Sequence, residues 1–220
     1  MNRPFEERLI RMKRSRKISL TSLGNQNPML GKQKFIDKVL RRFFLLFRPA
    51  MNGRIFDKDG KRIEKTRISN TTYIDHPQCL TVGPNVFIGQ FNYLEASNGI
   101  TIEEGCQLTT FINITSHSSH MSIRLYGKHY GESDMKGYER GSVHIGKYTF
   151  IGPHSTIMPK TKIGKGSIVS AYSYVRGEFP DFSIISGNPA KVVGDTRNID
   201  ERQLRQYPEL RSYYEEWSKD

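Results

Sequence analysis

Residues 145–175 read, in groups of six, IGKYTF, IGPHST, IMPKTK, IGKGSI and VSAYSY, followed by Val175. Every group begins with an aliphatic residue, and its fifth position is always Thr or Ser. A fixed short period of this kind indicates a solenoid. Three such units would close a triangular coil of about 18 residues, with the aliphatic side chains stacked on the axis and the small ones near the corners. The stretch therefore predicts an all-β solenoid.

The same rhythm extends upstream, with one shift of two residues. The aliphatic positions are Val82, Ile88, Leu94 and Ile100 before the shift, and Ile102, Leu108 and Ile114 after it. Neither the alternation of a β-sandwich nor the helical stretches of a βαβ fold occur between residues 70 and 195. We therefore place the solenoid domain at residues 71–195.

The two cysteines, Cys79 and Cys106, have different places in this rhythm. Cys106 stands two residues before Leu108, at a small inward position, so we expect a buried side chain and not a reactive thiol. Cys79 lies 27 residues earlier, about one and a half coils away. The two would not stack, and we expect no disulfide between them.

The interval from Ile114 to Ile145 is 31 residues, which is not a multiple of six. One hexapeptide and an inserted loop at about residues 117–142 would explain it. Long excursions from a compact body are usually functional or disordered. This one carries three of the six histidines, His117, His120 and His129, which favours function.

The chain has a formal charge of +12, and the excess lies entirely in a basic arm, residues 1–70. The arm carries 19 Lys+Arg against 6 Asp+Glu, whereas residues 71–220 carry 15 against 16. Residues 33–48 have apolar positions at helical spacing among Lys and Arg, which predicts an amphipathic helix ended by Pro49. This helix would pack on the body or a neighbouring subunit, or lie on an anionic membrane surface. No nucleic-acid recognition motif accompanies the charge.

The two ends of the chain suggest a location and a helical tail. The N-terminal residues show no apolar segment typical of a signal peptide, and two cysteines are few for a secreted disulfide scaffold. We therefore expect a cytoplasmic protein, with the arm as a peripheral contact to the inner membrane face. Residues 196–220 predict a helical tail broken at Pro208, whose aromatic face packs on the barrel or the next subunit.

The repeat, together with the closing segment Gly187-Asn188-Pro189-Ala190-Lys191-Val192, resembles the hexapeptide acyltransferases over residues 75–195. Within that superfamily the chain is most similar to the maltose/galactoside acetyltransferase type. The stretch Asn113–His120 resembles the catalytic segment of the capsule and O-antigen (surface polysaccharide) O-acetyltransferases. The resemblance implies a left-handed parallel β-helix, a homotrimer with active sites between subunits, acetyl-CoA as co-substrate, and no metal.

Acetyl transfer to a sugar hydroxyl needs a base near neutral pH, and histidine meets this need. His120 lies six residues after Ile114, where the next axial position would fall, and a polar ring is poorly placed there. His117 lies where the loop begins, and the resemblance also favours it. His117 is thus the expected base and His120 the alternative; both could instead be structural or bind substrate.

Other residues are expected to bind the acceptor or CoA. His129 and Glu139 lie in the inserted loop, and Asn92, with Gln90 as its competitor, lies near an acceptor-binding Asn of the resembling family. The resemblance implies that Ser170 and Ala171 offer backbone contacts to the pantetheine arm. It also implies that Lys191 meets the CoA phosphates. Arg176 precedes Gly177, which stands where the family often has Lys, so Arg176 would replace that charge. Of the remaining histidines, His144 and His154 are expected as outward strand residues.

The sequence thus predicts an O-acetyltransferase that acts on a carbohydrate, a surface polysaccharide or its precursor. A second enzyme hypothesis is acyl transfer to another small acceptor, such as serine or an amino-sugar nucleotide. A hypothesis from a different class is a non-catalytic solenoid scaffold. The histidine-bearing loop and the intact closing segment argue against the scaffold.

Overall fold

The computed structural model describes residues 35–40, 43, 48–132 and 134–219. The chain divides into two compact units, Met1–Arg48 and Pro49–Asp220. In the first unit, residues 35–40 and 43 are helical, in agreement with the expected helix at 33–48, and the other residues of that helix lie outside the described residues. Its described apolar side chains are exposed: Phe35, Ile36, Val39, Leu40 and Phe43.

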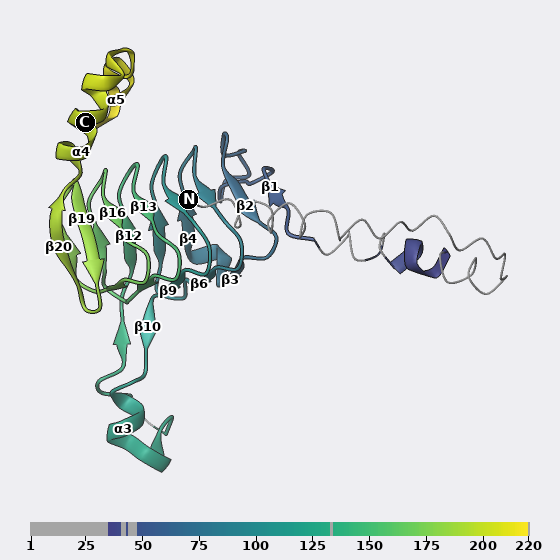
Figure 1. Cartoon of the computed structure of the whole chain (residues 1–220). Coiled ribbons are helices and arrows are strands. Elements are labelled where there is room, and N and C mark those ends of the chain that lie inside the picture. Colours follow the sequence, from purple (N-terminus) through teal and green to yellow (C-terminus); the bar gives the residue numbers. More distant parts are fainter. Residues whose placement is uncertain (1–34, 41–42, 44–47, 133, 220) are drawn as a thin grey trace, which may run out of the picture. The chain divides into compact units, whose positions relative to one another are not determined.

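The second unit is a parallel β-helix with three sheets, so the predicted left-handed β-helix class is confirmed (Figure 1). The first sheet has the order β1 (Met51–Asn52), β2 (Arg67–Ser69), β5 (Phe87–Ile88), β8 (Gln107–Leu108), β13 (Phe150–Ile151), β16 (Ile168–Val169), β19 (Ser183–Gly187) and β20 (Ala190–Asp195). The second has the order β18 (Glu178–Phe179), β15 (Lys162–Ile163), β12 (Val143–Ile145), β7 (Ile100–Ile102) and β4 (Leu80–Val82). The third has the order β17 (Tyr174–Val175), β14 (Thr156–Ile157), β9 (Asn113–Thr115), β6 (Tyr93–Glu95) and β3 (Tyr73–Asp75).

The core contains both rows that the repeat predicts. The six aliphatic residues from Ile145 to Val175 at six-residue spacing are fully buried. The small row is buried as well, and its hydroxyl groups satisfy backbone carbonyls of the next coil. Thr149 Oγ1 donates to the Gly164 carbonyl at 3.1 Å, and Ser155 Oγ donates to the Ser170 carbonyl at 3.1 Å. Small hydroxyl residues therefore fill the corners without leaving unpaired polar groups.

The shift of two residues in the upstream rhythm has a structural cause. Early coils take 20 residues in all three sheets, because Ile88 pairs with Leu108 in the first, Leu80 with Ile100 in the second and Leu94 with Ile114 in the third. Later coils take 18, as between Ile151 and Val169. The extra pair of residues lies between the third and second sheets, where the Gly99 amide donates to the Ala96 carbonyl in a turn.

The β-helical unit begins earlier than residue 71. Strand β1 pairs with β2 in antiparallel register, and β2 pairs in parallel with β5. Residues from Pro49 onward belong to the compact second unit. Ile68 extends the buried aliphatic row by one coil. The sequence analysis did not include it, because the basic composition continues to residue 70.

Cys106 is buried, as expected, and Cys79 and Cys106 are both free thiols. The Cys106 Sγ lies 3.1 Å from the Gly146 carbonyl oxygen. Burial raises the pKa of the Cys106 thiol to about 12, so the thiolate form is suppressed and the side chain behaves as a small core residue.

The inserted loop leaves the coil as a two-stranded hairpin and returns to it (Figure 1). Strand β10 (His117–Ser118) pairs with β11 (Glu139–Arg140) in antiparallel register. Helix α3 (Ser122–Tyr126) and the 3₁₀ helix η2 (Gly127–His129) lie beyond β10. Another 3₁₀ helix, η1 (Pro77–Cys79), links β3 to β4.

The tail is helical and breaks at Pro208, as predicted. It consists of α4 (Thr196–Gln206), η3 (Pro208–Leu210) and α5 (Arg211–Ser218). The Asp195 carboxylate caps α4 by accepting a hydrogen bond from the Arg197 amide at 2.9 Å. Trp217 packs against Tyr148 and Phe182 of the β-helix, with ring centroids 4.6 and 6.0 Å apart. Among the described residues, no helix has the length and apolar character that crossing a membrane would require.

Candidate functional site

A buried carboxylate and a half-exposed imidazole meet at the base of the hairpin. Glu95 is the last residue of β6 and pairs with Thr115 of β9, two residues before His117. The Glu95 Oε2 atom lies 2.8 Å from His117 Nδ1. The Glu95 side chain is only 3% exposed, whereas that of His117 is 36% exposed. One edge of the imidazole is therefore held inside while the rest of the ring reaches the surface.

The Glu95 carboxylate is held in its ionised form. Its Oε1 accepts the Ser97 amide at 2.8 Å, and its Oε2 accepts the Ser116 amide at 3.0 Å and the Ser116 hydroxyl at 2.9 Å. Burial acts to raise the pKa of Glu95, but the hydrogen bonds from Ser97 and Ser116 outweigh it and lower the pKa to about 2. Glu95 is thus a carboxylate at neutral pH, and it accepts hydrogen bonds only.

This carboxylate selects one tautomer of the neutral His117 ring. An acceptor at 2.8 Å from Nδ1 requires the proton on that nitrogen, which leaves a lone pair on Nε2. A His oriented by a carboxylate in this way can take a proton through Nε2, and the carboxylate then stabilises the imidazolium. The arrangement has the parts of a general base.

Glu95 was not expected from the sequence. It directly follows the axial residue Leu94, and alternation along a strand places it on the opposite face, toward solvent. Its burial comes from Ser116 and His117 of the next coil, which cover it. The weak signal in the sequence was the acidic residue itself, placed one coil before the histidine segment.

His120 and His129 lie farther along the insertion, outside the Glu95 pair. His120 is exposed, and its Nδ1 lies 2.8 Å from the Ser118 hydroxyl. His129 is 60% exposed and pairs with Glu132 at 3.0 Å. The described contacts thus give only His117, among these three histidines, a buried carboxylate partner.

Asn92 lies in the wall of the β-helix and not on its surface. Its side chain is 2% exposed. The amide donates to the carbonyls of Gly89 and Thr109, both at 3.1 Å, and the side-chain oxygen accepts the Ile112 amide at 2.8 Å. These bonds engage both ends of the group. Asn92 thus joins two coils, and its expected contact with the acceptor stays a prediction.

Two residues expected at different subsites come together. Glu139 of β11 forms an ion pair with Arg176, which directly follows β17. Glu139 was expected at the acceptor and Arg176 at CoA. The ion pair ties the return strand of the insertion to a later coil, and the expected roles of Glu139 and Arg176 stay predictions.

The residues expected at CoA lie on the last coils. Ser170 and Ala171 join β16 to β17, and Lys191 lies exposed in β20. The Ser170 amide donates to the Ile185 carbonyl at 2.8 Å, so this amide serves the coil. Ala171 is exposed. A Cβ added at Gly152 would lie 2.6 Å from the backbone nitrogen of Ala171, which shows how closely the coils of these two residues approach each other.

The remaining histidines lie on the outer surface, with one departure from expectation. His144 is an outward strand residue, 3.2 Å from Glu103. His154 is exposed but sits at a corner with φ of 59°, stacked between Phe111 and Tyr172. Positive φ is uncommon for non-Gly residues in general, although His adopts it more often than most, and the six-residue pattern did not distinguish this corner residue from a strand residue.

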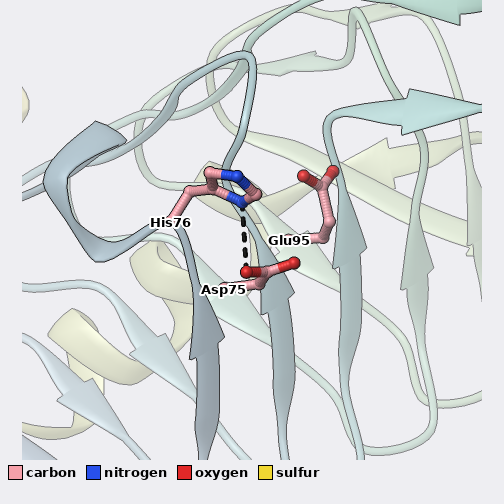
Figure 2. Close-up of side chains that lie close together, drawn as sticks. All are labelled: Asp75, His76 and Glu95. Atoms are coloured by element: carbon pink, nitrogen blue, oxygen red, sulfur yellow. Dashed lines mark ion pairs between the residues drawn. The ribbon is translucent and has the colours of Figure 1, made fainter.

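Asp75 and His76 lie beside Glu95 on the neighbouring coil, as Figure 2 shows. Asp75 pairs with Glu95 in the sheet, and His76 Nδ1 is 3.1 Å from Asp75 Oδ1. One ligand atom from each residue falls within a span of 4.8 Å, so the three could approach a divalent cation. Glu95 already accepts three hydrogen bonds from Ser97 and Ser116, and a cation would compete with His117 for it. The geometry therefore favours the His117 imidazole, and not a cation, as the partner of Glu95.

Comparison with known proteins supports the repeat and the fold. Residues 142–177 match the family described as bacterial transferase hexapeptide (six repeats). An Escherichia coli strain K12 protein, WbbJ, described as a candidate lipopolysaccharide-biosynthesis O-acetyltransferase, is 30% identical over 112 residues. This match covers 50% of the chain and 57% of WbbJ, so the chain spans little more than half of that relative.

Two solved structures have the same fold. AntD, an N-acyltransferase from Bacillus cereus solved with dTDP and 3-hydroxybutyryl-CoA, gives a TM-score of 0.53 at 19% identity over 68% of the chain and 90% of AntD. A maltose O-acetyltransferase from Clostridium difficile 630 gives 0.50 at 22% identity, over 61% of the chain and 67% of that protein. At these identities the likeness concerns the fold.

Proposed function

The chain carries the hexapeptide repeat of the bacterial transferases, and on this premise we propose that it transfers an acetyl group from acetyl-CoA to a carbohydrate hydroxyl. The observation that carries the proposal is the pair of His117 and the buried Glu95 carboxylate, 2.8 Å apart. The description of WbbJ as a candidate O-acetyltransferase of lipopolysaccharide biosynthesis supports a surface glycan, or its precursor, as the acceptor.

In this mechanism His117 acts twice. Its Nε2 takes the proton of the acceptor hydroxyl as the oxygen attacks the thioester carbonyl of acetyl-CoA. The tetrahedral intermediate then collapses, the carbon–sulfur bond breaks, and Nε2 returns the proton to the departing CoA sulfur. Glu95 keeps the ring in the Nδ1–H tautomer and offsets the positive charge of the imidazolium between the two steps.

The same proposal includes the expected surroundings of the site. Lys191 would meet the phosphates of CoA, and Ser170 and Ala171 would line its pantetheine arm. A homotrimer would bring these last coils of one subunit to the His117 of another. The basic arm would hold the enzyme near an anionic membrane that carries the acceptor.

An amine acceptor is the second candidate, because the N-acyltransferase AntD shares the fold. The chemistry of a base next to an acyl thioester serves hydroxyl and amine acceptors alike. Identification of the acetylated atom by NMR of the product separates the two.

The test is release of CoA from acetyl-CoA by the full chain, measured with a panel of sugars, lipid-linked sugars, serine and amino-sugar nucleotides. We expect turnover with a sugar hydroxyl and a fall of about 10³-fold or more in His117→Ala, by analogy with loss of a catalytic base. His120→Ala serves as the matched control and should retain activity. Full activity of His117→Ala would exclude this residue as the base, and no binding of acetyl-CoA by calorimetry would favour the scaffold.

A further inference from the structure

The exposed part of the His117 ring is not left open on all sides. Tyr138, the residue just before β11, stacks on it with ring centroids 5.6 Å apart and an interplanar angle of 18°. The imidazole is thus held along one edge by Glu95 and covered on one face by Tyr138. Tyr138 comes from the return segment of the insertion, 21 residues after His117.

The return segment is fixed to the β-helix at several points around Tyr138. Arg140 is the register partner of His117 in the hairpin, and its guanidinium carbon lies 4.5 Å from the centroid of the Tyr138 ring. The Gly141 amide donates to the Ser116 carbonyl at 3.0 Å. The Glu139 carboxylate pairs with Arg176 of another coil. Contacts on neighbouring residues therefore fix the place of the Tyr138 ring.

The Glu95 carboxylate at 2.8 Å and the Ser97 hydroxyl at 3.3 Å both contact the His117 ring at Nδ1. Contacts at this one ring atom do not fix the direction of Nε2, because the ring can still tilt about Nδ1 and terminal torsions of His are broad. A flat aromatic face against the ring restricts this tilt. Since proton transfer requires the acceptor proton within about 2.6–3.2 Å of Nε2, an unrestricted ring would spend much of its time misdirected.

We propose that Tyr138 is a positioning residue for His117: its aromatic face holds the imidazole so that Nε2 points to the acceptor hydroxyl. This inference rests on the proposed function, because it assigns His117 the role of base. It also gives the insertion a role, since Tyr138 enters the site only when the hairpin returns to the coil.

The phenol hydroxyl is not the group that matters. Burial, followed by the neighbouring Tyr130, raises the pKa of Tyr138, while Arg140 lowers it to a smaller extent. The phenol is therefore neutral at physiological pH and remains a weak acid. The face of the ring is common to Tyr and Phe, so the proposal predicts that Phe can replace Tyr138.

The experiment compares Tyr138→Phe and Tyr138→Leu with the unmodified chain, with Tyr213→Leu as a control at an exposed aromatic residue of α5. We expect Tyr138→Leu to lower kcat by about 10- to 100-fold, the scale of a misplaced catalytic group, with the KM for acetyl-CoA changed less than about twofold. Tyr138→Phe and Tyr213→Leu should stay within about threefold of the unmodified kcat. Circular dichroism checks that each variant is folded.

A second readout does not depend on turnover. In the folded chain the Tyr138 ring should shift the proton resonances of the His117 ring, and the shift should persist in Tyr138→Phe and disappear in Tyr138→Leu. A missing shift in the unmodified chain overturns the proposal whatever the activity. Equal kcat in Tyr138→Leu, or equal loss in Tyr138→Phe, also overturns it. An unmodified chain that shows the shift but no acetyl transfer would instead refute the proposed function.

Discussion

The coils of residues 143–175 and the insertion at residues 117–142 follow opposite rules. In the coils, position in a six-residue group fixes the environment of each side chain, and the axial row from Ile145 to Val175 is fully buried. In the insertion no period exists, and contacts join distant residues, such as Tyr138 with His117 and Glu139 with Arg176. The difference indicates that the repeat builds a regular support, and that His117 and Tyr138, two residues of the proposed site, lie where the repeat is interrupted.

The largest effect should come from the contact between Glu95 of a coil strand and His117, the first residue of the insertion. Glu95→Gln keeps the size of the side chain but presents an amide to His117 Nδ1, and it no longer supplies a negative charge to the imidazolium. We expect kcat to fall by about 10²- to 10⁴-fold, as when a carboxylate that orients a catalytic His is made neutral. The measurement is acetyl-CoA turnover with the acceptor identified in the panel.

Asp75→Asn is the matched control, because Asp75 pairs with Glu95 in the sheet but bonds His76. It should retain most of the activity. If Glu95→Gln were as active as the unmodified chain, the proposed role of the Glu95–His117 contact in catalysis would be refuted.

A smaller effect concerns stability alone: a substitution in the coils should lower the free energy of unfolding more than one in the insertion. Ile157→Ala removes three methyl-type groups from the fully buried axial row and should lower the free energy of unfolding by about 2–5 kcal/mol. Leu125→Ala, at a side chain 67% exposed on α3, should change it by less than about 0.5 kcal/mol. Urea unfolding followed by circular dichroism gives both values, and similar losses in the two variants would contradict the division into support and site.

The smallest predicted effect concerns pH. The folded state lowers the pKa of Glu95 from 4.5 to about 2. A lowered folded-state pKa gives stability that is complete above the unfolded pKa and is lost as pH falls through the folded one. Between about pH 5 and pH 2 the unmodified chain should therefore lose up to about 3 kcal/mol through this group, whereas Glu95→Gln should lack that component.

The check is thermal unfolding of both proteins at several pH values in this window. Identical slopes of stability against pH would show that Glu95 titrates normally in the folded chain. That result would also remove the argument that a permanent carboxylate selects the His117 tautomer.

Predictions of the buried residues of the coils, made from the six-residue period, were confirmed, whereas those for the insertion and its partners depended on contacts that the period does not show. Cys106, the axial row and the small row were placed correctly, because an inward residue in one coil is stacked on an inward residue in the next. The sequence did not show that the Asn92 amide joins two coils, because its partners Thr109 and Ile112 lie one coil later, and its expected role at the acceptor stays a prediction. The break of the tail at Pro208 was predicted because proline cannot continue a helix.

The sequence by itself determined the solenoid, its core and the location of the insertion, and it predicted His117 as the base, a role that stays a prediction. The solenoid and its core depend on a six-residue period, which several consecutive groups along the chain display without any tertiary contact. Only the tertiary structure decided that Glu95 lies buried against His117, that Tyr138 covers the ring, and that Arg176 pairs with Glu139. These partners are separated by 21 to 37 residues and meet only when successive coils stack and the hairpin returns, so no local pattern records them.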